Sequence, residues 1–164
     1  MDRIRIFITI FIVVIGVSEI KPSKDAMKYI TSGFVKVLDE CKHELNLSDQ
    51  IISDLFHYWK LEYTQLTRDT GCAIICMSKK LELMDSNGKL HHGNAQEFAK
   101  SHGADDVVAT KLVTIIHDCE KENEGGDDEC LRVLEVAKCF RSGIHALDWA
   151  PTVEVIVEEV LKEI

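Results

Sequence analysis

Six cysteines are the sequence feature that most limits how this chain of 164 residues can fold. Cys72 and Cys76 are one helical turn apart, so on a helix they share a face and each can reach a different neighbouring helix. Zinc sites usually contain two short clusters of Cys or His, and the sequence has no second cluster of that kind. The pattern therefore predicts three disulfides in a helical fold, and it leaves their pairing open. The cysteines are Cys41, Cys72, Cys76, Cys119, Cys130 and Cys139.

The N-terminus has the pattern of a signal peptide. Two arginines precede an apolar run at residues 6–17, which is shorter than the ~20 residues that a membrane-spanning helix needs. We expect residues 1–22 to be the signal peptide, with cleavage between positions 18 and 22. Residues 23–164 should then form a single soluble domain that is secreted and oxidised.

Composition narrows the class of partner and the class of fold. The chain carries a net charge of −9, which argues against nucleic acid as a partner because phosphate backbones repel an acidic protein. Pro22 and Pro151 are its two prolines, so long helices can run through almost all of the chain between them.

Hydrophobic periodicity predicts about six helices and an amphipathic tail. Residues 71–77 are apolar on all sides, as in a central buried helix. Turn residues at 85–88 and an acidic, glycine-containing loop at 121–128 separate the segments, and no alternating strand pattern occurs. The fold class is therefore all-α. The predicted helices cover residues 27–46, 48–59, 71–77, 92–103, 107–119 and 130–140, and the tail covers 152–164.

Five segments, together with the cysteine spacing, resemble the insect odorant-binding proteins and among them the moth pheromone-binding proteins. The resemblance covers about residues 23–164. It implies helices around an internal hydrophobic cavity and the disulfides Cys41–Cys76, Cys72–Cys130 and Cys119–Cys139, each worth about 3 kcal/mol in the entropic model. The segments are Leu38–Cys41, Gly71–Ser78, Leu90–Ala95, His102–Asp105 and Trp149–Pro151.

The resemblance implies a soluble carrier for a long-chain alcohol, aldehyde or acetate. Such a carrier crosses sensillar lymph and releases its ligand near a receptor or membrane surface, and it is compatible with a homodimer. By position, Phe34 and Phe140 match an aromatic pair that sandwiches the ligand, while Trp59 and Ser78 match groups near its polar end. Further lining is expected from Met27, Ile74, Leu90, Val113 and Val136.

Each of these residues also has a plain structural interpretation. The apolar ones can be ordinary core, and Ser78 can hydrogen-bond to its own helix backbone. Similarly, Asn46-Leu47-Ser48 is a glycosylation sequon, but Ser48 suits a helix N-cap, which we favour.

The resemblance also implies that acid releases the ligand. His91, His92 and His117 match histidines with this role, and histidine is the side chain that ordinarily titrates in mildly acidic conditions. The tail is implied to lie outside the cavity at neutral pH and to become an inserted helix at low pH. Protonation of Glu154 and Glu163 would remove the penalty for burying their charge.

Other functions remain as alternatives. A nonselective lipid carrier or a general-odorant carrier would share the same fold. A metal site at His91-His92 is disfavoured because adjacent residues rarely chelate one ion, and no cofactor is expected. His117-Asp118-Cys119 resembles the catalytic helix of secreted phospholipases, but the glycine-rich calcium loop is missing, so we do not expect an enzyme.

Overall fold

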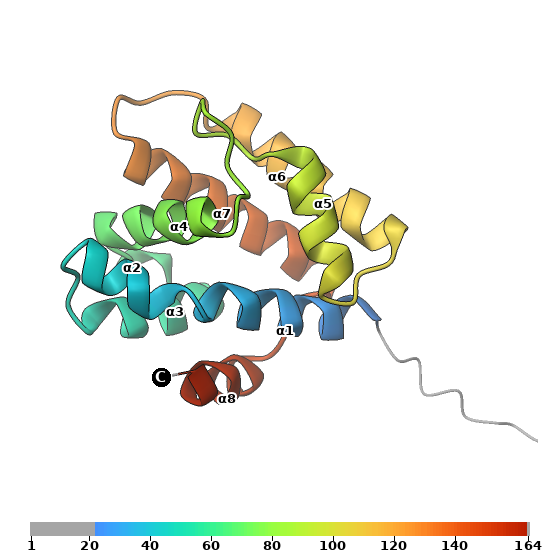
Figure 1. The fold of residues 1–164 in the computed structure, drawn as a ribbon, viewed down its shortest axis with the longest axis horizontal. Coiled ribbons are helices and arrows are strands. Elements are labelled where there is room, and N and C mark those ends of the chain that lie inside the picture. Colours follow the sequence, from blue (N-terminus) through green and yellow to red (C-terminus); the bar gives the residue numbers. More distant parts are fainter. Residues whose placement is uncertain (1–21, 164) are drawn as a thin grey trace, which may run out of the picture.

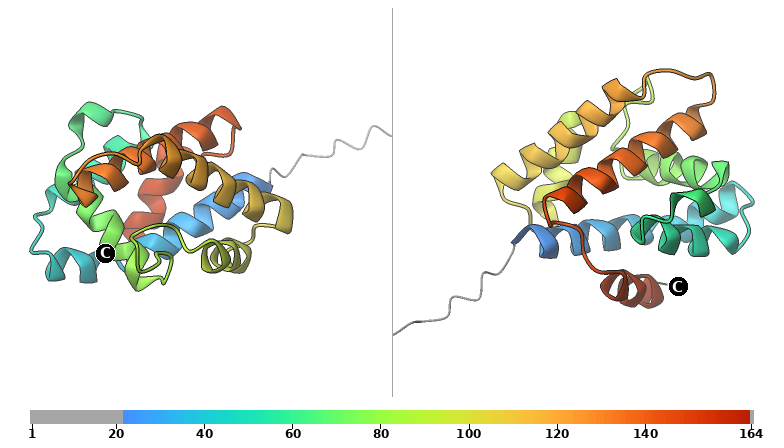
Figure 2. Two further views of the ribbon diagram at one scale, coloured as in Figure 1. Left: turned by 90° about the horizontal axis from the view of Figure 1, so that it is seen from above. Right: turned by 180° about the vertical axis from the view of Figure 1, so that it is seen from behind.

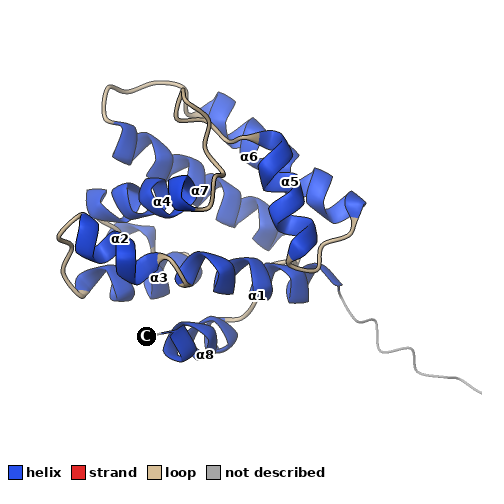
Figure 3. Ribbon diagram, in the orientation of Figure 1, coloured by secondary structure: helices blue, strands red, loops and turns tan. Residues whose placement is uncertain are grey.

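The computed structural model describes residues 22–163, so the expected signal peptide and Ile164 lie outside the described residues. Within that range the chain is all-α, as predicted, with one isolated bridge between Met84 and Leu90 (Figures 1 and 3). The helices are α1 (Pro22–Val35), α2 (Leu38–Glu44), α3 (Gln50–Trp59), the 3-10 turn η1 (Tyr63–Gln65), α4 (Arg68–Lys80), α5 (His92–Ser101), α6 (Asp106–Glu122), α7 (Glu129–Ala146) and α8 (Val153–Glu163).

The prediction of one helix over residues 27–46 is wrong, because the chain turns at Lys36–Val37 and forms α1 and α2 instead. The Val37 N–H bonds to the Phe34 carbonyl, three residues back, which tightens the helix locally. The two pieces then pack on different partners, α1 against α8 and α2 against α4. Hydrophobic periodicity does not show which helix a segment packs against, so it could not show that α1 and α2 have different partners. The described part of the chain therefore contains seven α-helices before the tail rather than about six, and the tail itself forms α8.

The three disulfides have the pairing that the resemblance implied. Cys41–Cys76 joins α2 to α4, Cys72–Cys130 joins α4 to the start of α7, and Cys119–Cys139 joins α6 to α7. The central helix α4 is thus fixed to two neighbours by cysteines one turn apart. A further helix, α5, packs on α6 on the side of the molecule away from α2 and α3 (Figure 2).

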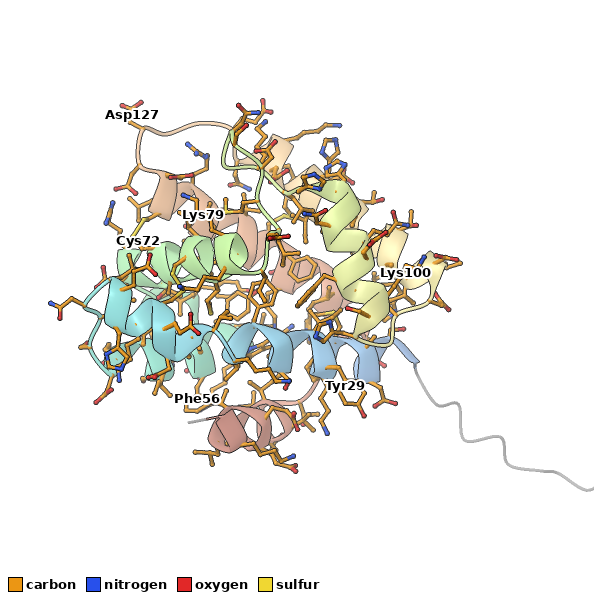
Figure 4. All side chains as sticks on the ribbon, viewed as in Figure 1. Tyr29, Phe56, Cys72, Lys79, Lys100 and Asp127 are labelled. Atoms are coloured by element: carbon orange, nitrogen blue, oxygen red, sulfur yellow. A yellow bond between two sulfur atoms is a disulfide. The ribbon has the colours of Figure 1, made fainter. Side chains whose placement is uncertain are left out.

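Polar side chains mark where several helices begin. Asp105 Oδ1 accepts the Val108 N–H at 2.7 Å, and Asp128 Oδ1 accepts the Leu131 N–H at 3.1 Å. Ser48 Oγ accepts the Gln50 N–H at 3.3 Å just before α3, but the N-cap position of that helix is Asp49 rather than the expected Ser48. The loop between α6 and α7, which contains Asp127, extends away from the helices (Figure 4).

The described helices include none with the length and apolar character needed to cross a bilayer.

Candidate ligand cavity

A cavity of about 610 Å³ lies among α1, α3, α4, α5, α6 and α7, and the loop before α5 covers part of it. This volume is within the range of roughly 300–1,000 Å³ that small-molecule sites usually have. All nine residues expected from the sequence to contact a ligand lie in its wall. Their contact with a ligand stays a prediction. They are Met27, Phe34, Trp59, Ile74, Ser78, Leu90, Val113, Val136 and Phe140.

The wall is mostly hydrocarbon. On α4, Ile74 and Ser78 line the cavity, while the two cysteines of that helix bond to α2 and α7. One helix therefore serves both the disulfide framework and the cavity, with the two functions on different faces. Apolar wall residues that the sequence analysis did not name include Ile30, Leu55, Met77, Phe98, Leu112, Ile116 and Val133.

The aromatic residues of the wall come from separate helices. Phe34 on α1 stands edge-on to Phe98 on α5, with ring centroids 5.8 Å apart. Among the described residues, Phe34 forms this ring pair with Phe98 and not with Phe140 on α7. The two rings expected to sandwich a ligand are therefore not stacked on each other.

Three hydroxyl-bearing side chains, Thr31, Tyr58 and Ser78, lie in the wall. Thr31 Oγ1 donates to the Met27 carbonyl at 2.7 Å, and Tyr58 OH donates to the Ala137 carbonyl at 3.0 Å. Burial raises the pKa of Tyr58 well above its usual value, so its hydroxyl stays neutral. Ser78 has no side-chain hydrogen bond among the described residues, so it does not bond back to its own helix. Among the three, Ser78 is the one whose hydroxyl proton is not already donated to a protein group, so it can be donated to a polar group in the cavity.

Trp59 is held in the wall by a buried arginine. Arg141 Nη2 donates to the Trp59 carbonyl at 2.7 Å, and the guanidinium lies 5.2 Å from the centre of the Trp59 ring. Both residues are buried. Burial lowers the pKa of Arg141 because it removes water from the charged group. These contacts fix the position of the indole, and its predicted closeness to a ligand head group stays untested.

One end of the cavity, which we call the mouth, is polar. Its rim consists of Asn87, Lys89, Glu120, Asn123, Glu124 and Arg132. The loop 85–90 is tied to α6 there, since Glu120 Oε1 accepts the Leu90 N–H at 2.7 Å. Lys89 Nζ lies 3.1 Å from Glu124 Oε1. One contact with α6 and one with the loop that follows α6 therefore hold the loop that covers the mouth.

The structure brings together two of the three predicted histidines. The rings of His92 and His117 are edge-on, with centroids 4.9 Å apart, beside the mouth. His91 is exposed, and its Nδ1 accepts the Asn94 N–H at 3.2 Å as the N-cap of α5. The role of the three in acid release stays a prediction. Asp118 is exposed and does not line the cavity, so it forms no shared site there with His117.

The tail already forms a helix, α8, on the outside of the bundle (Figure 1). The resemblance implied instead that the tail becomes a helix when it inserts into the cavity at low pH. Figure 1 shows α8 beneath α1, away from α4 to α7. Ile156 and Val160 are fully buried, 0% and 1% exposed, so the apolar stripe of α8 is covered without entering the cavity. Val160 nevertheless reaches the cavity wall. A helix as short as α8 is not stable by itself in water, and its packing against the rest of the molecule supplies the buried apolar contacts that stabilise it.

The buried acid of the tail is Glu159, whereas the acids expected from the sequence to respond to pH were Glu154 and Glu163. Glu159 is 8% exposed, and its Oε1 lies 3.0 Å from Lys162 Nζ and 3.4 Å from Lys28 Nζ on α1. Glu154 is exposed, and hydrogen bonds from its own backbone N–H and from Thr152 lower its pKa. The side chain of Glu163 lies outside the described residues. Glu159 precedes Val160 of the apolar stripe directly in the sequence, and this position was the signal that could have indicated its burial.

Comparisons with known proteins agree with this architecture. Residues 23–143 match the model of the PBP/GOBP family. Pheromone-binding protein 2 of Epiphyas postvittana is 50% identical over 145 residues, which cover 88% of each chain. General odorant-binding protein 2 of Bombyx mori is 39% identical over 143 residues, 87% of this chain and 86% of that one. The crystal structure of Epiphyas postvittana pheromone binding protein 3 is 62% identical, with a TM-score of 0.67, and the match covers 71% of this chain and 99% of that chain.

Proposed function

The chain belongs to the PBP/GOBP family, and on that premise we propose that it is an extracellular carrier for a long-chain apolar molecule with one polar head group. An alcohol, aldehyde or acetate has this chemistry. The single observation that carries the proposal is the apolar cavity of about 610 Å³ in which Ser78 offers a free hydroxyl. A hydrocarbon chain gains from burial along the wall, and the hydroxyl gives a head group one hydrogen bond.

We assign the ligand to the pheromone class rather than to general plant odours. The two relatives named as pheromone-binding proteins are 50% and 62% identical to this chain, while the relative named as general odorant-binding protein 2 from Bombyx mori is 39% identical. In this proposal the carrier takes up the molecule at an air–water boundary, crosses an aqueous lymph and delivers it to a receptor membrane.

Release in this proposal is promoted by acid and involves α8. Because Val160 reaches the cavity wall, undocking of α8 frees its apolar stripe next to the cavity, where the stripe can compete with the ligand. The charged groups next to Glu159 are Lys28 on α1 and Lys162 and Glu158 on α8. A chain that ends at Thr152 should therefore keep its ligand at an acidic pH where the intact chain loses it. Equal loss from both chains would remove the tail from the mechanism.

Binding is tested by displacement of a fluorescent apolar probe, N-phenyl-1-naphthylamine, from the purified protein. The competitors form a series of equal chain length that ends in an alcohol, an aldehyde, an acetate or a plain methyl group, repeated at several chain lengths. The proposal requires an optimum in chain length and tighter binding of the polar-headed members. A flat response across both variables would indicate a nonselective lipid carrier instead.

A further inference from the structure

His92, His117 and Glu120 form a cluster of potential metal ligands beside the mouth of the cavity. His92 lies at the start of α5, and the other two are three residues apart on α6, so they share a face of that helix. One ligand atom from each residue lies within 4.8 Å of the others. We propose that these three side chains bind a zinc ion that links α5 to α6.

Two imidazoles and one carboxylate are a ligand set that zinc uses, with a water as the fourth ligand. In a tetrahedral site with bonds of about 2.1 Å, the ligand atoms are roughly 3.4 Å apart, so the cluster must close by roughly an ångström. His92 can supply that movement because its side chain is exposed. A pocket of about 300 Å³ adjoins the cluster and has room for the ion and its water.

The surroundings of the cluster position Glu120. Its Oε1 accepts the Leu90 N–H at 2.7 Å, which leaves the second carboxylate oxygen for a metal. The pocket also contains Asp85, whose pKa is lowered by hydrogen bonds from the backbone N–H groups of Lys89 and Asn87, so it adds negative charge. The cations of the pocket are Lys89, which pairs with Glu124, and Lys121, which is exposed.

This site differs from the adjacent pair that the sequence suggested and that we disfavoured. His91 Nδ1 is occupied as the cap of α5, whereas His92 faces His117 on another helix. A helix-to-helix site of this kind has no complete signature in spacing along the chain, because His92 is 25 positions from His117 and 28 from Glu120. The packing of α5 on α6 brings them together.

A bound ion would also restrain the mouth of the cavity. Leu90 and Glu120 line both the cavity and the pocket beside the cluster, so fixing Glu120 and His92 fixes the loop that covers the mouth. Zinc should therefore slow the exchange of a bound ligand. This consequence, unlike the site itself, rests on the proposed carrier function.

The site is tested by calorimetric titration of the purified full chain with zinc chloride, with magnesium and calcium chloride as comparisons. We expect one zinc ion per chain and no saturable binding of the other two ions, since imidazole ligands favour transition metals. His92→Ala, His117→Ala and Glu120→Gln should each weaken zinc binding about tenfold or more. Glu120→Gln keeps an oxygen that accepts the Leu90 N–H, so it removes the ligand charge without freeing the loop.

The matched control is His91→Asn, which removes the neighbouring imidazole but keeps a good N-cap for α5. It should change zinc affinity by about twofold or less, because a cap is not a ligand. Should His117→Ala unfold, His92→Ala decides, since that side chain is exposed. Unchanged zinc binding in His92→Ala, or binding lost equally in His91→Asn, would overturn the site. The titration needs no organic ligand, so its outcome is independent of the carrier proposal. The effect of zinc on the mouth is tested separately, by stopped-flow release of N-phenyl-1-naphthylamine with and without zinc.

Discussion

Gly71 on α4 lies against the main-chain carbonyl oxygen of Cys130 on α7, and a Cβ atom at position 71 would stand 1.8 Å from that oxygen. The contact is next to the Cys72–Cys130 disulfide, where the two Cα atoms are 4.7 Å apart. Only a residue without a side chain allows the two helices to approach this closely. Gly71 is therefore needed for the packing of the two central helices.

Gly71→Ala should lower the free energy of unfolding by about 3 kcal/mol, because the backbone of Cys130 would have to move and strain the surrounding packing. Chemical denaturation with the disulfides intact measures the change. The control is Gly125→Ala in the loop before α7, where a Cβ would meet nothing within 4 Å. Similar losses of stability in the two variants would show that the loss is not caused by the contact with Cys130.

The sequence was informative where a local pattern determines structure. The cysteine pair on α4 predicted a helix bonded to two neighbours, and helical period located the other helices. The turn at Lys36–Val37 was missed because no proline or glycine marks it, and because the change depends on the separate partners of α1 and α2. The requirement for Gly71 was missed for the same reason, since it depends on a carbonyl 59 positions away.

Ser78→Ala should weaken the binding of a long-chain alcohol by about 1 kcal/mol, the usual contribution of one hydrogen bond, and leave the matching alkane unchanged. The prediction follows from the position of Ser78 in the cavity wall without a protein partner. Competition against a fluorescent probe measures both ligands. Ser53→Ala on α3, outside the wall, is the control. Equal losses for alcohol and alkane in Ser78→Ala would contradict a head-group contact and point to a change in shape.

Asp54 on α3 connects two helices of the cavity wall. Its carboxylate is 1% exposed and accepts hydrogen bonds from Gln50 at 2.9 Å, Thr67 at 3.0 Å and Thr70 at 2.7 Å. Burial by itself raises its pKa, but the hydrogen bonds outweigh burial, and the pKa of Asp54 lies below its usual value of 3.8. The ionised group thus holds the start of α4 against α3.

Asp54→Ala should lower the free energy of unfolding at pH 7 by about 3 kcal/mol, because it leaves buried hydroxyl groups without an acceptor. Because the folded pKa is lowered, the wild-type contribution is present above the ordinary pKa and is lost as pH falls through the folded value. Thermal unfolding from pH 7 to pH 2.5 should therefore bring the two proteins closer together at acid pH. A constant difference across that range would show that the charge of Asp54 is not the source of stability.

The sequence predicted which residues line the cavity, but it did not predict which residues these side chains contact. The nine wall residues came from a resemblance, and the helices indeed place them around one cavity. Their partners did not follow from the sequence. Phe98 stands against Phe34 only because α5 folds over α1, and His92 meets His117 only because α5 packs on α6. Contacts between helices decide such pairs, and a single sequence does not encode them in its spacing.

The docking of α8 should resist mild acid and weaken in stronger acid. Hydrogen bonds from Lys162, and less strongly from Lys28, lower the pKa of Glu159 below its usual 4.5. A lowered pKa means that the docked state is favoured while the carboxylate is ionised. That contribution is complete above the ordinary pKa and is lost as pH falls through the lowered one. Docking should thus persist between pH 7 and pH 5.

Amide hydrogen exchange at Ile156 and Val160, corrected for the intrinsic effect of pH, measures this docking. We expect equal protection at pH 7 and pH 5 and a loss of protection below about pH 4.5, where glutamates take up protons. Glu159→Gln should reduce protection already at pH 7 and flatten its dependence on pH, because the neutral amide forms no ion pair with Lys28. Glu158→Gln changes an exposed partner of Lys162 and should have little effect, as exposed ion pairs contribute little. The contradicting outcome is a loss of protection in wild-type α8 between pH 7 and pH 5, with the same pH dependence in Glu159→Gln. Groups other than Glu159 would then control the undocking of α8, and the acid response would arise elsewhere in the molecule.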